Sequence, residues 1–256
     1  MSFQERIKQK KGKEKIIMLT AYDCQMANIL DQAGIDMILV GDSSGMVVQG
    51  HKDTKSVTMA DMIFHVKAVA SGATSVPIIG DLPIHSCNTV DDCLENAKKF
   101  AEAGADGVKI EGKKTDAIKA LIKEGIPVMG HVGMLPQIAE TYHVKGKKPE
   151  EAQEILQDGL DLDRLGVFSM VLECIPESLA NTITNSVKVP TIGIGAGKHC
   201  DGQVLVINDM LGFDENFKPK YVKTYANLNK TIKDAVAKFI EEVSTGKYPD
   251  EEHTYH

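Results

Sequence analysis

Several side chains that could do chemistry stand at the ends of short apolar runs in this chain. They are Asp42 and Ser43, then Asp81, Lys109, Glu111, His131 and Glu173. A single Asp after a strand is as often a helix cap, and a single Glu often pairs with a surface lysine. Lys109 and Glu173 fit neither role, because they sit within apolar runs where an unpaired charge is costly to bury. The set therefore favours one shared reactive site.

Asp42 and Asp81 follow consecutive apolar runs, so their carboxylates could share one cation. Carboxylate oxygens without nearby Cys or paired His ligands favour a hard ion such as Mg2+, which keeps coordination positions for water or substrate. Glu111 could be a further ligand. The alternative is a network of Asp–Lys109 ion pairs that only ties strands together.

Short apolar runs and helix-like segments alternate along the chain, as expected for parallel strands joined by right-handed helical crossovers. The runs are apolar throughout, which is typical of strands buried on both faces. The eight runs cover residues 16–19, 37–40, 77–79, 107–110, 126–129, 170–172, 190–192 and 203–207. Helix-like segments such as 26–33 and 93–103 separate most of them.

A weak internal repeat supports one closed α/β domain. Helix-like segments end at Gly34, Gly104, Gly125 and Gly166, where glycine tolerates the left-handed conformation. An apolar run follows each glycine, and a polar side chain stands six to eight residues after it.

A chain of 256 residues is close to the ~250 typical of a (β/α)8 barrel. In that fold, side chains past the C-terminal strand ends converge on one mouth. An open doubly wound sheet is the competing fold, because periodicity alone does not establish closure.

We expect a single barrel domain over 1–256, with an N-terminal helix or arm at about 1–14. From about 211 to 256 the pattern changes to a loop, a helix over 227–243 and a polar tail, expected to pack outside the barrel.

Composition narrows the class of protein. The net charge of −7 argues against general affinity for nucleic acid or anionic membranes. The sequence shows no secretory signal, and it has no apolar run of the ~18 residues that would suggest a membrane span. We therefore expect a cytoplasmic protein with no membrane association. The five cysteines are odd in number and lack zinc-site spacing, so we expect reduced thiols.

The glycine-rich stretch 193–197 follows the seventh run. A dinucleotide-binding fingerprint would need glycine in place of Lys198 and should open the chain's first βα unit. We expect instead a turn at the barrel mouth whose amides face an anionic group, or a turn required only for backbone packing.

Motifs spread over nearly the whole chain resemble those of the ketopantoate hydroxymethyltransferase family. Those that carry the likeness are Thr20-Ala21-Tyr22-Asp23, Val40 to Met46, Gln49-Gly50-His51, Gly80-Asp81-Leu82-Pro83, Val108 to Gly112, Gly130 to Gly133, Val171 to Pro176, Ile192 to Gly197, Asp201-Gly202-Gln203, Phe217 to Lys220 and Pro249 to His253.

The resemblance implies a (β/α)8 TIM barrel of the phosphoenolpyruvate/pyruvate type. It implies transfer of a hydroxymethyl group from 5,10-methylenetetrahydrofolate to 3-methyl-2-oxobutanoate, in pantothenate and coenzyme A biosynthesis. It also implies a homo-oligomer, typically a decamer.

Residue by residue, the resemblance places Mg2+ on Asp42 and Asp81, with Glu111 as the further acidic group. The keto acid would be held by Asp42, Ser43, Asp81 and Lys109. Glu173 matches the proton acceptor, and His131 matches a histidine near the reacting centre.

This chain departs from the family pattern at Met134 to Gln137, at Glu140 to Tyr142 and at His85 to Asn88. Two other functions remain open from the sequence. One is a related Mg2+-dependent barrel that cleaves or rearranges a C–C or P–C bond of an oxo acid. The other is a barrel that only binds.

Overall fold

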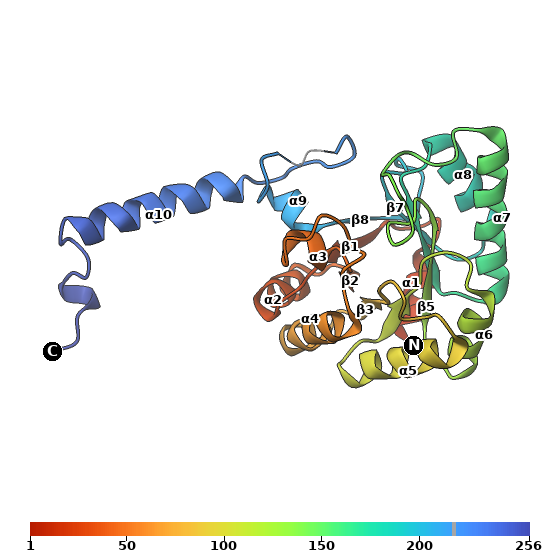
Figure 1. The fold of residues 1–256 in the computed structure, drawn as a ribbon, viewed down its shortest axis with the longest axis horizontal. Helices are drawn as coiled ribbons and strands as arrows, with labels where there is room; N and C mark the ends of the chain where they lie inside the picture. The colour runs from red at the N-terminus through yellow and green to blue at the C-terminus, as the bar shows by residue number, and fades with distance from the viewer. Residues whose placement is uncertain (217–218) are drawn as a thin grey trace. The chain divides into compact units, whose positions relative to one another are not determined.

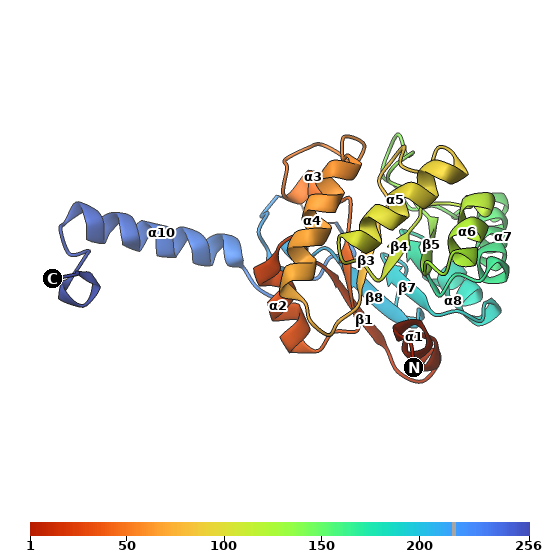
Figure 2. The same ribbon diagram turned by 90° about the horizontal axis from the view of Figure 1, so that it is seen from below.

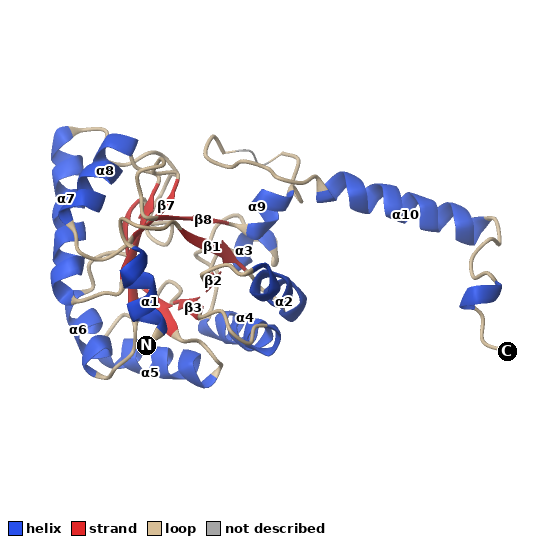
Figure 3. Cartoon of the chain, turned by 180° about the vertical axis from the view of Figure 1, so that it is seen from behind, coloured by secondary structure: helices blue, strands red, loops and turns tan. Residues whose placement is uncertain are grey.

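Eight parallel strands form a closed barrel in which each strand pairs with the next and β8 pairs with β1 (Figures 1 and 3). The structure is a computed structural model that describes residues 1–216 and 219–256. The strands are β1 (Ile16–Thr20), β2 (Met37–Val40), β3 (Ile78–Asp81), β4 (Gly107–Lys109), β5 (Val128–Gly133), β6 (Ser169–Glu173), β7 (Thr191–Ile194) and β8 (Gly202–Leu205). The predicted barrel is confirmed, and the open sheet is excluded.

The barrel interior is an apolar core built from alternate residues of the strands. Met18, Met37, Ile79, Met129 and Ile192 are all fully buried in this cluster. Helix α1 (Phe3–Lys10) adds buried Ile7, and its Phe3 packs edge-on against Phe168, just before β6. Helix α1 therefore closes the N-terminal end of the barrel.

Helices surround the strands and contact one another in chain order from α2 through α4, α5, α6 and α7 to α8 (Figure 2). Their bounds are α2 (Cys24–Ala33), α3 (Ser44–Val47), α4 (Met59–Gly72), α5 (Val90–Glu102), α6 (Thr115–Lys123), α7 (Pro149–Leu165) and α8 (Glu177–Ser186). The four glycines predicted to end helix-like segments, Gly34, Gly104, Gly125 and Gly166, all have positive φ. This confirms the repeat that predicted the fold.

Three strands begin one or two residues later than predicted, and the cause is proline. The carbonyls of Pro77, Pro127 and Pro190 each accept a hydrogen bond from a backbone N–H of the strand that precedes it in the chain. Proline itself has no N–H to donate. The ladder therefore starts after them. The predicted run 126–129 was wrong in extent, because β5 continues to Gly133 and includes His131. The last run was also too long, because Ile207 belongs to a helix.

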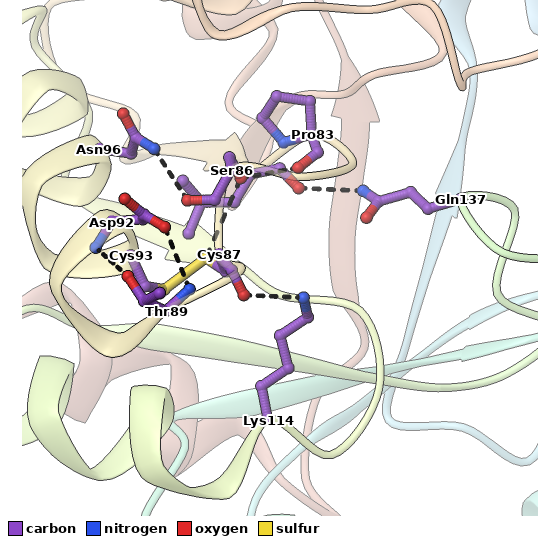
Figure 4. The surroundings of a disulfide bond; sticks show 10 residues. Pro83, Ser86, Cys87, Thr89, Asp92, Cys93, Asn96, Lys114 and Gln137 are labelled. Carbon is purple, nitrogen blue, oxygen red and sulfur yellow. Dashed lines mark hydrogen bonds between the residues drawn. A yellow bond between two sulfur atoms is a disulfide. The ribbon is translucent and has the colours of Figure 1, made fainter.

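The prediction of five reduced cysteines was wrong for two of them. Cys87, in the loop after β3, and Cys93, in α5, form a disulfide with their Cα atoms 4.2 Å apart (Figure 4). A hydrogen bond also holds this loop against α5, because Asn96 Nδ2 donates to the Ser86 carbonyl. Cys24, Cys174 and Cys200 are free.

Residues Ile207–His256 form a separate compact unit from Met1–Val206. The unit contains α9 (Ile207–Leu211), α10 (Leu228–Ser244) and a short 3-10 helix over Glu251–His253. The helix predicted over 227–243 is thus observed with shifted ends. Of the Phe217 to Lys220 motif, Phe217 and Lys218 lie outside the described residues. In the described ranges, no helix is long and apolar enough to cross a membrane.

Candidate active site

The predicted site residues converge at the C-terminal end of the barrel. Asp81, Lys109 and Glu173 are the last residues of β3, β4 and β6. Asp42 lies two residues beyond β2, and Glu111 two residues beyond β4. The parallel register pairs Asp81 with Lys109, and Gly133 with Glu173. Strand pairing therefore brings together residues that are far apart in the chain.

A buried ion pair lies at the centre of this group. Lys109 Nζ is 2.8 Å from Asp81 Oδ1 and 2.7 Å from Oδ2, and 3.9 Å from Glu111 Oε1. Burial alone would lower the pKa of Lys109, but Asp81, Glu111 and Asp42 outweigh it and raise this pKa. The Asp–Lys109 pair foreseen as an alternative to a metal site therefore exists, and Lys109 is held in its charged form.

One lysine does not neutralise three buried carboxyl groups. Burial, reinforced by the charge of Asp81, raises the pKa of Asp42 well above its usual value. Burial also raises the pKa of Glu111 to about 8, although Lys109 opposes the shift. The excess of buried acidic groups means that a bound cation would stabilise their ionised forms.

The donor chemistry of this site fits a hard divalent cation. Glu111 Oε1 is buried and has no hydrogen-bond partner, which leaves one carboxylate oxygen available. The structure describes residues 1–216 and 219–256, and within them no group of three or more His, Cys, Asp or Glu side chains is arranged to hold a metal ion by itself. Mg2+ does not require such a cage, because it usually binds one or two carboxylates and completes its octahedron with water and substrate.

His131 joins the acidic cluster to Glu173. Its Nε2 lies 3.2 Å from Glu173 Oε2, and its Nδ1 lies 3.6 Å from Glu111 Oε1. Burial and the charge of Lys109 lower the pKa of His131 well below its usual value, so the ring is neutral. Burial raises the pKa of Glu173 to about 7. A carboxyl group that exchanges its proton near neutral pH suits a general acid–base role.

The Ser43 side chain contacts a tyrosine at the mouth of the barrel. Its hydroxyl lies 2.8 Å from the Tyr22 hydroxyl, in the loop after β1. Among the described residues, the Ser43 side chain makes no hydrogen bond to the other predicted site residues, and it lies beside Asp42 because the two are consecutive in the chain.

Gln137 is a site residue that the sequence analysis missed. Its Nε2 donates to Asp42 Oδ2 at 3.0 Å and to the Leu82 carbonyl at 2.9 Å, and its backbone N–H donates to Glu111 Oε2 at 3.1 Å. Its side chain therefore orients Asp42, and its backbone orients Glu111. The stretch Met134 to Gln137 was noted only as a departure from the family pattern, and these contacts depend on how the loop folds over the barrel.

Glycine is required where β5 approaches Glu173. Gly133 has φ of 101°, and a Cβ there would lie 2.4 Å from the Glu173 carbonyl oxygen. The glycine-rich turn also uses this freedom, since Gly195 and Gly197 have positive φ. Whether its amides face an anion stays a prediction.

Comparison with known proteins decides the family. The sequence profile described as ketopantoate hydroxymethyltransferase matches residues 1–251. The chain belongs to the ketopantoate hydroxymethyltransferase family. Two relatives named 3-methyl-2-oxobutanoate hydroxymethyltransferase agree. The one from Clostridium botulinum (strain 657 / Type Ba4) is 50% identical, covering 94% of this chain and 90% of the relative. The one from Syntrophus aciditrophicus (strain SB) is 49% identical, covering 96% and 93%.

Solved structures resemble this member of the ketopantoate hydroxymethyltransferase family in fold. Phosphonopyruvate hydrolase has a TM-score of 0.65 at 13% identity, covering all of this chain and 92% of the other. Phosphoenolpyruvate phosphomutase from Streptomyces platensis subsp. rosaceus has a TM-score of 0.63 at 15% identity, covering 99% and 91%. The fold is thus shared with this hydrolase and this phosphomutase, whereas the sequence likeness is to the hydroxymethyltransferases.

Proposed function

We propose that the protein transfers a hydroxymethyl group from 5,10-methylenetetrahydrofolate to 3-methyl-2-oxobutanoate and forms 2-dehydropantoate, toward pantothenate and coenzyme A. Family membership and relatives of that name at about half identity support this activity. The observation that carries the chemistry is the buried cluster of Asp42, Asp81, Lys109, Glu111 and Glu173 at one mouth.

The acidic groups would hold Mg2+, with Asp42 and Asp81 as ligands and Glu111 as the further carboxylate. When bound, the ion supplies Lewis-acid stabilisation of negative charge on the substrate's oxygens. Lys109, kept charged by Asp81, offers a second positive group to the substrate carboxylate. Ser43 would donate a hydrogen bond to the same molecule.

Glu173 would remove the proton from C3 of the oxo acid. Its carboxyl oxygen lies 3.2 Å from His131 Nε2, a buried nitrogen that has no hydrogen-bond partner among the described residues. The C3 carbon then forms the new bond to the one-carbon unit, and both bonds from that unit to the folate nitrogens N5 and N10 break. Water supplies the hydroxyl group, and its other proton and the proton taken from C3 end on the two nitrogens. The products are 2-dehydropantoate and tetrahydrofolate.

Product analysis by proton NMR tests this function. We expect 2-dehydropantoate only when Mg2+, the oxo acid and methylenetetrahydrofolate are all present. Asp42→Ala should abolish its formation, because a metal ligand and a substrate contact are both lost. Failure of the folded wild-type protein to form the product with all components would contradict the proposal.

We also propose that the chain acts in the cytoplasm as a homo-oligomer, a decamer by family resemblance. Light scattering on the purified protein should then give a mass near ten times that of the 27.8 kDa chain. A monomer mass at micromolar concentration would contradict this.

A further inference from the structure

A cleft of about 420 Å³ lies beside the end of β5, between the segment that follows this strand and the first half of α7. Its volume is within the range of small-molecule sites. Its lining includes Gly133, Leu135, Ile138, Glu140, Glu154 and Ile155.

The cleft begins next to the backbone of the strand end that carries the proposed base. Gly133, on its wall, is the strand partner of Glu173, and the Met134 N–H donates to the Glu173 carbonyl at 2.9 Å. The same segment returns to this place, because the Lys145 N–H donates to the Cys174 carbonyl. The cleft therefore borders the backbone of Glu173, whose side chain is not part of its lining.

One wall of the cleft is apolar. Ile155 forms a buried part of it, and Leu135 is half-buried. Ile138 is 72% exposed, although large aliphatic side chains are usually covered. These side chains offer contact area to a flat ring.

The other wall carries carboxylates from one face of α7, and two of them are already engaged. Glu151 accepts a hydrogen bond from the Gly146 N–H, and Asp158 pairs with Lys113 at 2.9 Å. Glu154 lies between them in sequence and makes no hydrogen bond or ion pair to any described residue. It is the carboxylate on α7 in this cleft that is available to a ligand.

We propose that this cleft binds the 2-amino-4-oxopyrimidine ring of the one-carbon donor, with Glu154 accepting hydrogen bonds from the ring N–H and the amino group. Two adjacent N–H donors match the two oxygens of a carboxylate. The apolar wall covers the ring face. Lys145 already pairs with Glu151 at 3.7 Å, and the neighbouring Lys147 and Lys148 would supply positive charge for the donor's glutamate carboxylate. This inference rests on the proposed function, because it names the site of that reaction's second substrate.

Two cleft variants and one control test the proposal. Glu154→Gln removes the charge and replaces one acceptor oxygen with a donor. Ile138→Asp removes the apolar contact. Both side chains are exposed, so both variants should fold. Glu150→Gln is the matched control, because Glu150 is exposed on the same helix and does not line the cleft.

Steady-state kinetics should show the KM for methylenetetrahydrofolate raised at least about tenfold in both cleft variants, with a smaller change in kcat. The control should stay within about twofold of wild type. Exchange of the oxo acid's C3 proton into D2O, which needs no donor, should be unchanged in all three.

An unchanged KM for the donor in both cleft variants would overturn the proposal. A loss of C3 exchange matching the loss of turnover would also overturn it, because the cleft would then act through the oxo-acid site. Failure of the proposed function itself would look different, since wild-type protein would neither exchange the proton nor form product.

Discussion

The same strands build two unlike regions of the barrel, an apolar interior and a charged mouth. On β3, Ile79 belongs to the core and Asp81, two residues later, pairs with Lys109. On β5, Met129 belongs to the core and His131 contacts Glu173. Side chains two residues apart point to the same side of a strand, so both regions face the barrel axis. The apolar layer excludes water from the layer above it, and this desolvation shifts the pKa values of the site.

Glu173→Gln should cause the largest loss of activity at the charged mouth. The amide keeps the shape of the carboxyl group but does not accept a proton, so we expect kcat to fall by about 10²- to 10⁴-fold. Thermal unfolding should show a stable protein. Retention of more than half the wild-type kcat would remove Glu173 from its role as the base.

Lys109→Met should damage both stability and activity. It leaves Asp81 buried without its partner, and breaking a buried ion pair by removing one side typically costs about 3–5 kcal/mol. Urea unfolding should show this loss. Combining it with Asp81→Asn should restore much of the stability and none of the activity. Restored activity in the double variant would show that the pair is only structural.

Ile192→Ala tests the interior by itself. Ile192 is fully buried in the core, and β7 carries none of the predicted site residues. Creation of this cavity should cost about 2–5 kcal/mol of unfolding free energy. We expect kcat below the shifted melting temperature to stay within about twofold of wild type. A large loss of kcat in the folded variant would mean that the two regions are not separable.

Gln137→Ala should have an intermediate effect on the activity of the charged mouth. Asp42 and the Leu82 carbonyl each lose one hydrogen bond, whereas the backbone bond to Glu111 can remain. We expect kcat/KM for the oxo acid to fall about 10- to 100-fold, since a lost hydrogen bond to a charged group is worth about 1.5–3 kcal/mol. Gln137→Glu, which adds another acidic group beside Asp42, should be worse than alanine. The reverse order would contradict the positioning role.

The pH profile of kcat/KM tests the raised pKa of Glu173. Burial raises the pKa of Glu173 to about 7, so the base is protonated below that pH and kcat/KM should fall about tenfold per pH unit. Because the folded pKa lies above the ordinary 4.5, the contribution of Glu173 to stability is present below pH 4.5 and is lost as the pH rises through about 7. Glu173→Gln should therefore gain stability over wild type at pH 8. A flat activity profile from pH 5 to 8 would contradict this assignment.

Most of the barrel could be predicted because its cues are local. Apolar runs marked all eight strands, and glycines such as Gly34 and Gly166 marked helix ends through a conformation that other residues avoid. Strand ends were less accurate where proline begins a run. The strand-end positions of Asp81, Lys109 and Glu173 followed from the same periodicity.

Contacts made by loops could not be predicted, because they depend on distant segments. Gln137 meets Asp42 across 95 residues of sequence. The Cys87–Cys93 disulfide depends on the loop after β3 folding back on α5. Neither contact could be inferred from the spacing of these residues in the sequence.

The central claim is that the charged mouth removes the C3 proton of a 2-oxo acid. Proton NMR of 3-methyl-2-oxobutanoate in D2O, with Mg2+ and protein but no folate, measures this step alone. We predict loss of the C3 proton signal with wild type and Glu154→Gln, and its persistence with Glu173→Gln. A signal that persists with folded wild-type protein, or that disappears equally fast with Glu173→Gln, would contradict the account.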